Sequence, residues 1–329
     1  MLTKYALTAL TSFLLSGSAV FLLKKYALRR NLLIFQGVPA VGGIALGWAF
    51  YLVCLISSFW AGGLSFQAAG VLFSSLVMLA AGVVDDKREL SVAAKFLTQL
   101  FCVLILISFG VKIQITGLGS AVNLGLTIIW VLGITNAFNH LDVMDGVAAG
   151  TAVIASGGLG VICFLSPDAD MLLLFLPLMG AVLGFLIFNM PPAKVYLGNA
   201  GSHFLGFVLA SSALVLIYAP LERRIALLSP VAVLGFPVFD TIFVIWMRTL
   251  KRKSALKKSA DHLALRFLKM GHSKSKALSY MLFLALFFSL SGVMLGRLDN
   301  FRGIIFLGIV VMAGLLVGTK MAKVEVEQE

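Results

Sequence analysis

Long hydrophobic runs alternate with short polar segments along the whole chain. A helix needs roughly 20 apolar residues to cross a bilayer core of about 30 Å, and eleven windows of about that length can be read. Their limits are 5–23, 41–60, 67–84, 93–110, 121–138, 147–165, 171–188, 203–220, 229–247, 277–296 and 303–319. The pattern predicts an all-α polytopic membrane protein with about eleven transmembrane helices.

The composition supports this prediction and excludes an ordinary soluble enzyme. Of the 329 residues, 60% are hydrophobic and 12% are charged, whereas a soluble domain carries about 25% charged residues. The longest connection between windows, 248–276, is too short to fold alone. We therefore expect residues 1–329 to form a single integral membrane domain.

The net charge of +12 is unevenly divided between the two sides of the predicted bundle. Twenty Lys and Arg residues fall in one alternate set of connections and six in the other. The basic set comprises 24–40, 85–95, 139–146, 189–202, 248–276 and the tail after 319. Because basic loops stay in the cytoplasm, the N-terminus is predicted outside and the C-terminus inside. Such basicity attracts anionic lipid headgroups and phosphate-bearing substrates, and it does not point to nucleic acid.

Most of the unusual polar residues fall at the predicted cytoplasmic ends of the spans. Carboxylates at such positions are energetically expensive and tend to be functional. They predict a site at the cytoplasmic membrane surface rather than a path through the bilayer. The segments that would build it are 24–40, 85–95, 136–146, 189–202 and 248–276.

Asp85 and Asp86 are adjacent carboxylates at the end of a span. They repel each other unless a cation is shared, and Mg²⁺ prefers carboxylate and phosphate oxygens. The alternative is a solvated helix end beside Lys87 and Arg88. The pair alone leaves both interpretations open.

A polar residue recurs every third position in Asn136, Asn139, Asp142 and Asp145. An α-helix would spread this pattern around half its circumference, so a helix ending near Asn139 and a loop carrying the two aspartates are predicted. The alternative is that Asp145 caps the next span. A cap does not explain two amides and a second aspartate, which favours a functional site.

The segment 189–202 combines helix-breaking and permissive residues. Two prolines end a helix there, and Gly198 permits tight backbone near a ligand. Ser202 and the free amides that open the next span would favour an anion. An ordinary cytoplasmic loop remains the alternative for this stretch alone.

In this order and spacing, the segments resemble the polyprenyl-phosphate N-acetylhexosamine-1-phosphate transferase family, which contains WecA-like and MraY-like enzymes. The resemblance covers roughly residues 35–275. The matching pieces are Pro39-x-x-Gly42-Gly43, Asp85-Asp86 with Leu90-Ser91, Lys95 and Gln99, Asn136-x-x-Asn139-x-x-Asp142-x-x-Asp145-Gly146, Asn189-x-x-Pro192-Ala193-Lys194, Tyr196-x-Gly198-Asn199-x-Gly201-Ser202, Pro237 and Asp240, and Asp261-His262 with Arg266.

The resemblance implies transfer of a sugar-1-phosphate from a UDP-sugar to polyprenyl phosphate, with UMP released and Mg²⁺ (or Mn²⁺) required. It implies a multi-pass protein of the plasma membrane whose site faces the cytoplasm, with UDP-N-acetylglucosamine as the default donor. Dimers occur in the family, so a homodimer is compatible with it. The implied catalytic residues are Asp85, Asp86, Asp142 and Asp145, and the implied metal ligands are Asp85, Asp86 and Asn199. The implied substrate-binding residues are Asn136, Asn139, Asn189, Lys194, Gly198, Ser202, His262 and Arg266.

Two residues depart from the family pattern. The family usually has an aspartate metal ligand where this chain has Asn199, and Leu265 stands where another histidine is usual. A catalytically decayed member is therefore one alternative, and a membrane transporter is another. A CDP-alcohol phosphotransferase would need Asp-Gly-x-x-Ala-Arg, whereas Asp145-Gly146 continues as Val-Ala-Ala-Gly.

Overall fold

The computed structural model describes residues 2–60, 62–166, 171–218, 222–252 and 261–326. This part of the chain forms thirteen α-helices, one 3-10 helix (η1) and one short hairpin. The α-helices are α1 (Leu2–Arg30), α2 (Gly42–Trp60), α3 (Phe66–Lys87), α4 (Val92–Ser108), α5 (Ser120–Leu141), α6 (Val147–Phe164), α7 (Leu172–Asn189), α8 (Gly198–Ala213), α9 (Ser229–Val233), α10 (Gly235–Leu250), α11 (Leu263–Lys269), α12 (Lys274–Leu295) and α13 (Asn300–Ala322). The 3-10 helix η1 covers Arg224–Leu228, and the antiparallel hairpin pairs β1 (Ile34–Phe35) with β2 (Val38–Pro39).

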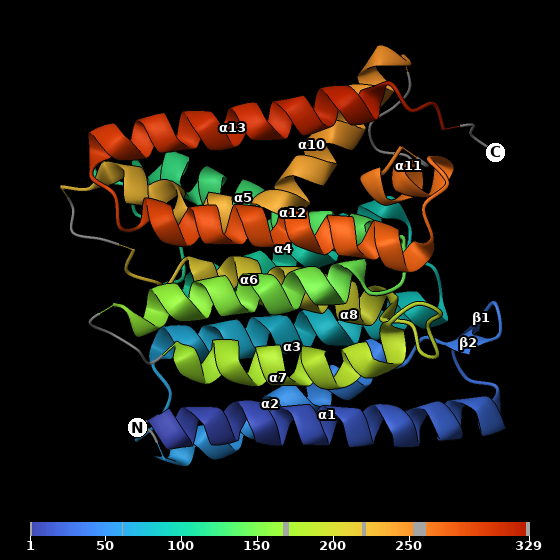
Figure 1. The fold of residues 1–329 in the computed structure, drawn as a ribbon. Helices are drawn as coiled ribbons and strands as arrows, with labels where there is room; N and C mark the ends of the chain where they lie inside the picture. Colours follow the sequence, from blue (N-terminus) through green and yellow to red (C-terminus); the bar gives the residue numbers. More distant parts are fainter. Residues whose placement is uncertain (1, 61, 167–170, 219–221, 253–260, 327–329) are drawn as a thin grey trace.

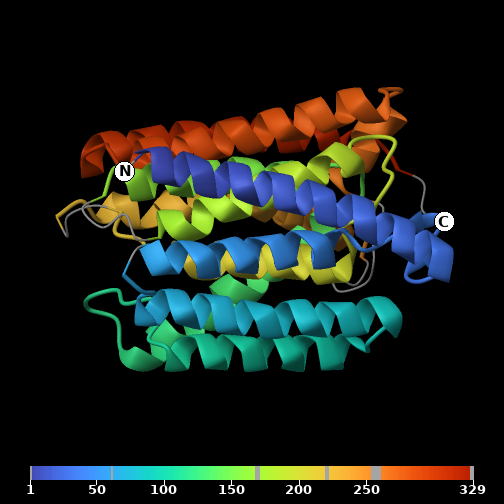
Figure 2. The same cartoon turned by 90° about the horizontal axis from the view of Figure 1, so that it is seen from below.

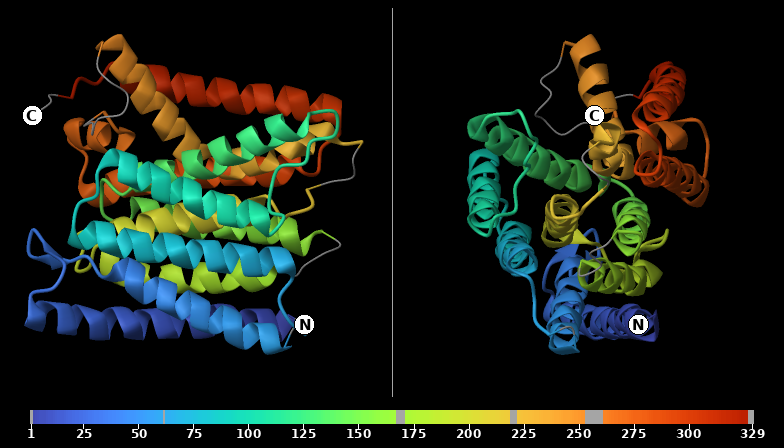
Figure 3. Two further views of the ribbon diagram at one scale, coloured as in Figure 1. Left: turned by 180° about the vertical axis from the view of Figure 1, so that it is seen from behind. Right: turned by 90° about the vertical axis from the view of Figure 1, so that its left-hand side faces the viewer.

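The long helices lie side by side in one bundle, as Figures 1 and 3 show. The helix α1 packs on α7, while α3 and α5 pack on α8. Every residue of α8 from Ala200 to Ala213 is buried. The helix α8 is therefore the central element of the bundle, and its first turn lies where the chemistry is expected.

Several helices begin at a residue whose side chain accepts a hydrogen bond from a backbone amide of the first turn. The first amides of a helix have no carbonyl within the helix to bind. Ser65, Ser91, Ser273 and Asp299 each accept one of these amides at the start of α3, α4, α12 and α13 respectively. These caps explain why the apolar windows become helices at these residues.

The structure confirms an all-α protein with multiple candidate membrane spans. Among the described residues, eight helices are long and apolar enough to cross a bilayer, or nine if η1 with α9 and the bent α10 form one span. The helices α4 and α8 fill two further predicted windows but are shorter, with 17 and 16 residues. The count of eleven crossings and the orientation remain predictions.

Two predicted windows differ from the helices that form. The window 203–220 is occupied by a helix that starts at Gly198 and ends at Ala213, because its polar first turn is stabilised by contacts that hydropathy does not register. The window 229–247 is broken by a 73° bend before Gly235. Pro237 lies in the first turn of α10, where its missing amide leaves no bond unmade.

The predicted cytoplasmic connections meet at one end of the bundle. Figure 1 shows the β1–β2 hairpin, α11 and the C-terminal end of α13 toward the right-hand end, and Figure 2 shows α1 reaching the same end. Of the loop 248–276, residues 253–260 lie outside the described residues. Segments far apart in the sequence are thus brought to a single face.

Small residues let two helices touch the start of α8. A Cβ on Gly82 of α3 would lie 2.4 Å from the Cα of Ala200, and one on Gly43 of α2 would lie 2.2 Å from the amide nitrogen of Gly201. Any side chain at these positions would push α8 away. The close packing therefore fixes α8 relative to the end of α3, which carries Asp85 and Asp86.

Candidate active site

The carboxylate of Asp86 binds the N-terminus of α8. One of its oxygens accepts the backbone amide of Asn199 at 2.7 Å, and the other accepts that of Ala200 at 3.0 Å. A helix N-terminus favours negative charge, so the anion position predicted here is filled by a side chain of the protein itself. Asp86 is thereby held in a single orientation.

Gly198 makes this contact geometrically feasible. Its φ is +74°, and a Cβ there would lie 2.7 Å from Oδ2 of Asp86. A side chain would be both strained and in collision with the carboxylate. Gly198 and Ser202 belong to the first turn of α8, so the connection predicted over 189–202 ends at Leu197.

Asn139 at the end of α5 joins the same turn. Its amide group donates to Oδ1 of Asn199 at 3.0 Å and to Oγ of Ser202 at 2.9 Å. These three predicted site residues therefore form one hydrogen-bonded group. The end of α5 and the start of α8 are locked together directly beside Asp86.

Asp145 and Asp142 follow in the loop before α6. The alternative that Asp145 caps α6 is wrong, because its carboxylate accepts the amide of Ala193 at 3.1 Å. The residue before α6 is Gly146, at φ +80°, which gives no side-chain cap. Asp145 instead ties this loop to the segment that leads into α8.

Asp142 has no hydrogen-bond donor within the described parts of the chain, although it is half-buried. Burial raises the pKa of its carboxyl well above the ordinary value, and the negative charges of Asp86 and Asp145 raise it further. A half-buried carboxylate near two other negative charges carries an uncompensated charge when it is ionised. A bound cation would compensate that negative charge.

The donor set suits Mg²⁺ that is completed by a substrate. Among the described residues, no three His, Cys, Asp or Glu side chains are grouped as a ready cation cage. Mg²⁺ is commonly bound by one or two carboxylates together with substrate phosphates and water. Asp86 and Asp142, with Asn199 alongside, offer oxygens of this type.

Asp85 and Asp86 have different partners despite being neighbours. Asp85 is buried, accepts the amide of Leu90 at 2.8 Å, and lies 2.8 Å from Nζ of Lys95. This ion pair lines a small pocket between α3, α4 and α8, together with Gln99 and His203. His203 follows Asn199 by one helical turn of α8, and the hydropathy pattern does not reveal it because the predicted window treats it as the start of an apolar span.

Two of the predicted substrate-binding amides have partners within the protein. Asn136 exchanges hydrogen bonds with Gln99 of α4. Asn189 accepts the amide of Gly146 at 2.9 Å and donates to the carbonyl of Val195 at 3.0 Å. Asn189 therefore supports the loops around the carboxylates, whereas Asn136 joins α5 to α4.

Lys194 presents an exposed side chain at the same rim. Within the described residues its ammonium group has no ion-pair or hydrogen-bond partner, while its backbone amide binds the carbonyl of Phe188. A free cation beside a carboxylate cluster is available for a phosphate group.

His262 and Arg266 have distinct environments. His262 is buried, with Nδ1 2.8 Å from Oδ2 of Asp240, and its ring stacks on that of His140 with centroids 6.0 Å apart. Arg266 is fully buried, and its guanidinium binds Asp261 and carbonyls near the C-terminal end of α13. Within the described residues, Arg266 makes no contact with Asp86, Asp142 or Asp145.

Comparison with known proteins identifies the family of the chain. The model of Glycosyl transferase family 4 matches residues 68–217, which include Asp86, Asp142 and the start of α8. The chain is 30% identical over 268 residues to the probable undecaprenyl-phosphate N-acetylglucosaminyl 1-phosphate transferase of Bacillus subtilis, covering 78% of this chain and 73% of the relative.

Two further relatives carry related descriptions. Decaprenyl-phosphate N-acetylglucosaminephosphotransferase of Mycobacterium leprae is 31% identical over 273 residues, covering 71% of this chain and 67% of the relative. Phospho-N-acetylmuramoyl-pentapeptide-transferase of Listeria monocytogenes is 33% identical over 199 residues, covering 54% and 60%. The chain is a multi-pass membrane protein that belongs to glycosyl transferase family 4, the family of polyprenyl-phosphate sugar-1-phosphate transferases.

Proposed function

We propose that the protein transfers N-acetylglucosamine-1-phosphate from its UDP derivative to polyprenyl phosphate, on the cytoplasmic face of the plasma membrane. UDP-sugars and polyprenyl phosphate are the substrates of the family. Two relatives described as N-acetylglucosamine-phosphate transferases support this choice of sugar. The products are polyprenyl-diphosphate-sugar and UMP.

The observation that supports this proposal most strongly is the set of carboxylates gathered around the start of α8. Asp86 is fixed by two backbone amides, whereas Asp142 has a raised pKa and no donor among the described residues. An uncompensated carboxylate such as that of Asp142 is energetically unfavourable in the protein without a ligand. It is stabilised when a diphosphate and its cation are bound.

The chemistry requires positioning and charge neutralisation. An oxygen of the acceptor phosphate attacks the phosphorus that carries the sugar. A new P–O bond forms, and the bond to the uridylyl phosphate oxygen breaks, so UMP leaves with that electron pair. The acceptor phosphate is largely ionised at neutral pH, so this step needs no strong base.

The residues of the chain divide this work. Lys194 contacts a donor phosphate from the exposed rim, and the Asp85–Lys95 pair orients the acceptor phosphate at its pocket. Asn139 keeps the first turn of α8 rigid. Mg²⁺, on which the family depends, would be held by Asp86 and Asp142 and would supply positive charge to the diphosphate.

The test is formation of labelled lipid by purified protein in nanodiscs, from radiolabelled UDP-N-acetylglucosamine and undecaprenyl phosphate. Asp86→Asn and Asp142→Asn should each lower turnover by about 10²–10³-fold, which is typical for loss of a charge-stabilising group. Asp299→Asn is the matched control, because Asp299 caps α13 at the other end of the bundle. Wild-type protein that forms no labelled lipid with any of several UDP-sugars would contradict the proposal and favour a decayed member.

A further inference from the structure

The segment Asp261–Leu263 is held by polar contacts on two sides. On one side, Asp240 of α10 binds the ring of His262 at 2.8 Å and accepts the amide of Leu263 at 3.1 Å. On the other side, Oδ1 of Asp261 lies 2.5 Å from Nζ of Lys251 and 2.9 Å from Nη2 of Arg266. All of these groups except Lys251 are buried.

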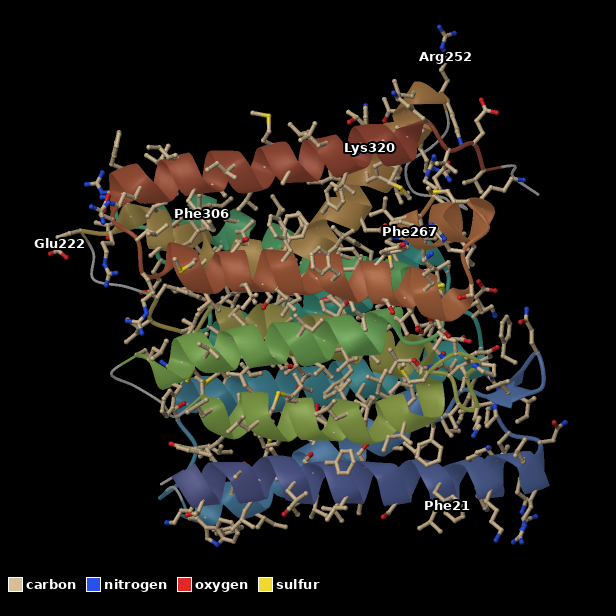
Figure 4. The ribbon with its side chains drawn as sticks, viewed as in Figure 1. Phe21, Glu222, Arg252, Phe267, Phe306 and Lys320 are labelled. Carbon is tan, nitrogen blue, oxygen red and sulfur yellow. The ribbon has the colours of Figure 1, made fainter. Side chains whose placement is uncertain are left out.

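Arg266 connects this segment to the C-terminal end of α13. Its guanidinium donates to the backbone carbonyl of Asp261 at 3.2 Å, to that of Met321 at 3.0 Å and to that of Val324. The fork geometry of a guanidinium suits several fixed acceptors at once. In Figure 4, Phe267 of α11 and Lys320 of α13 lie toward the same end of the bundle, opposite to Glu222.

The position of His262 depends on these contacts. Nδ1 of His262 faces Oδ2 of Asp240 at 2.8 Å, so Nε2 is directed away from Asp240. The outward face of the ring stacks on His140, which follows Asn139 on α5. His262 is thus fixed beside the residues that hold α8, although it comes from a different part of the chain.

We infer that the C-terminal end of α13 helps to hold His262 in position, and that Arg266 is the positioning residue that connects the two. Arg266 has no surface for a ligand, since its side chain is fully buried and its donors are engaged with the protein. It acts on the reaction only by holding the segment that carries His262. The kinetic part of this inference rests on the proposed function, together with the substrate-binding role of His262 that the family resemblance implies.

The test is a double-mutant cycle between Arg266→Met and His262→Ala, with turnover expressed per folded molecule. Arg266→Met should lower kcat by about tenfold or more and leave the KM for polyprenyl phosphate unchanged. In the His262→Ala background, Arg266→Met should cause no further loss, because the group that it positions is gone. Additive losses would overturn the inference, as would unchanged turnover in the single variant.

Two further variants separate positioning from misfolding. Arg266→Lys keeps the charge and should restore part of the lost turnover, whereas a chain ending at Lys323 lacks the Val324 carbonyl and should lose turnover in the same direction as Arg266→Met. Arg302→Met is the matched control, since Arg302 is an exposed arginine paired with Asp299 at the other end of α13. A chain ending at Lys323 that retains full turnover would overturn the role of the C-terminal end.

Hydrogen exchange gives a readout that does not depend on activity. In Arg266→Met, exchange should rise both in residues 261–270 and in residues 317–326, while α1 stays unchanged. A rise in both segments supports the coupling even if wild-type protein shows no transfer, a result that would defeat the proposed function alone. Unchanged exchange in either segment would overturn the coupling.

Discussion

Replacing Gly198 by alanine tests whether the contact between Asp86 and α8 maintains the site. The backbone of Gly198 has φ +74°, and the new Cβ would lie 2.7 Å from Oδ2 of Asp86 and 3.2 Å from its carboxyl carbon. Real Cβ contacts below 3.0 Å essentially do not occur, so the carboxylate must withdraw. The bond from Oδ2 to the amide of Ala200, now 3.0 Å, is the first to be lost.

The expected cost has two parts. A left-handed backbone costs a residue other than glycine about 1–2 kcal/mol. Loss of a hydrogen bond to a charged acceptor costs about 1.5–3 kcal/mol. The two parts together predict a destabilisation of about 2.5–5 kcal/mol, and displacement of Asp86 should also lower turnover by about tenfold or more.

Two alanine variants separate these parts. Gly37 has φ +80°, and a Cβ on it would meet no heavy atom within 4 Å, so Gly37→Ala should show the backbone cost alone. Gly119 has φ −65° and open space, so Gly119→Ala should be nearly neutral. Thermal inactivation and turnover would be measured for all three in nanodiscs. If Gly198→Ala matched Gly37→Ala in both measurements, the contact with Asp86 would not matter and the reasoning would fail.

Three further predictions concern the site, and a fourth concerns the orientation of the protein in the membrane. Lys194→Met should raise the KM for the UDP-sugar about tenfold, the equivalent of about 1.4 kcal/mol, and an unchanged KM and kcat would mean that this lysine only sets topology. Asp142→Asn should raise the melting temperature in EDTA. Folding raises the pKa of Asp142, so its carboxyl group stabilises the folded protein below the unfolded pKa, and this contribution is lost as the pH rises through the folded pKa. Asparagine has no charge that could cause this loss. An equal or lower melting temperature would show that the charge of Asp142 is already compensated. Asn199→Asp should lower the half-saturating Mg²⁺ concentration, since a carboxylate replaces a neutral oxygen, whereas equal half-saturation would place Asn199 away from the metal. In a chain without native cysteines, Ser275→Cys should resist an impermeant thiol reagent in intact cells while Ser120→Cys reacts, and the reverse would invert the proposed orientation.

The sequence by itself determined the helices and the set of residues at their ends. Each predicted apolar window contains a helix, because the length of an apolar run and the caps at its ends are local properties. The segments that contain Asp86, Asn139, Asp142 and Lys194 also lie at one end of the bundle, as their positions relative to the apolar windows indicated.

Only the tertiary structure decided which of these residues act together. Asp86 reaches the amides of Asn199 and Ala200 because Gly82 lets α3 contact α8, and no local pattern encodes that contact. The same reason explains why hydropathy misplaces the start of α8, since its polar first turn is stabilised by a carboxylate from another helix. Arg266 shows the converse. The family resemblance implied that it binds a substrate, but a buried guanidinium binds whichever acceptors the packed helices bring to it, and here these are Asp261 and the end of α13.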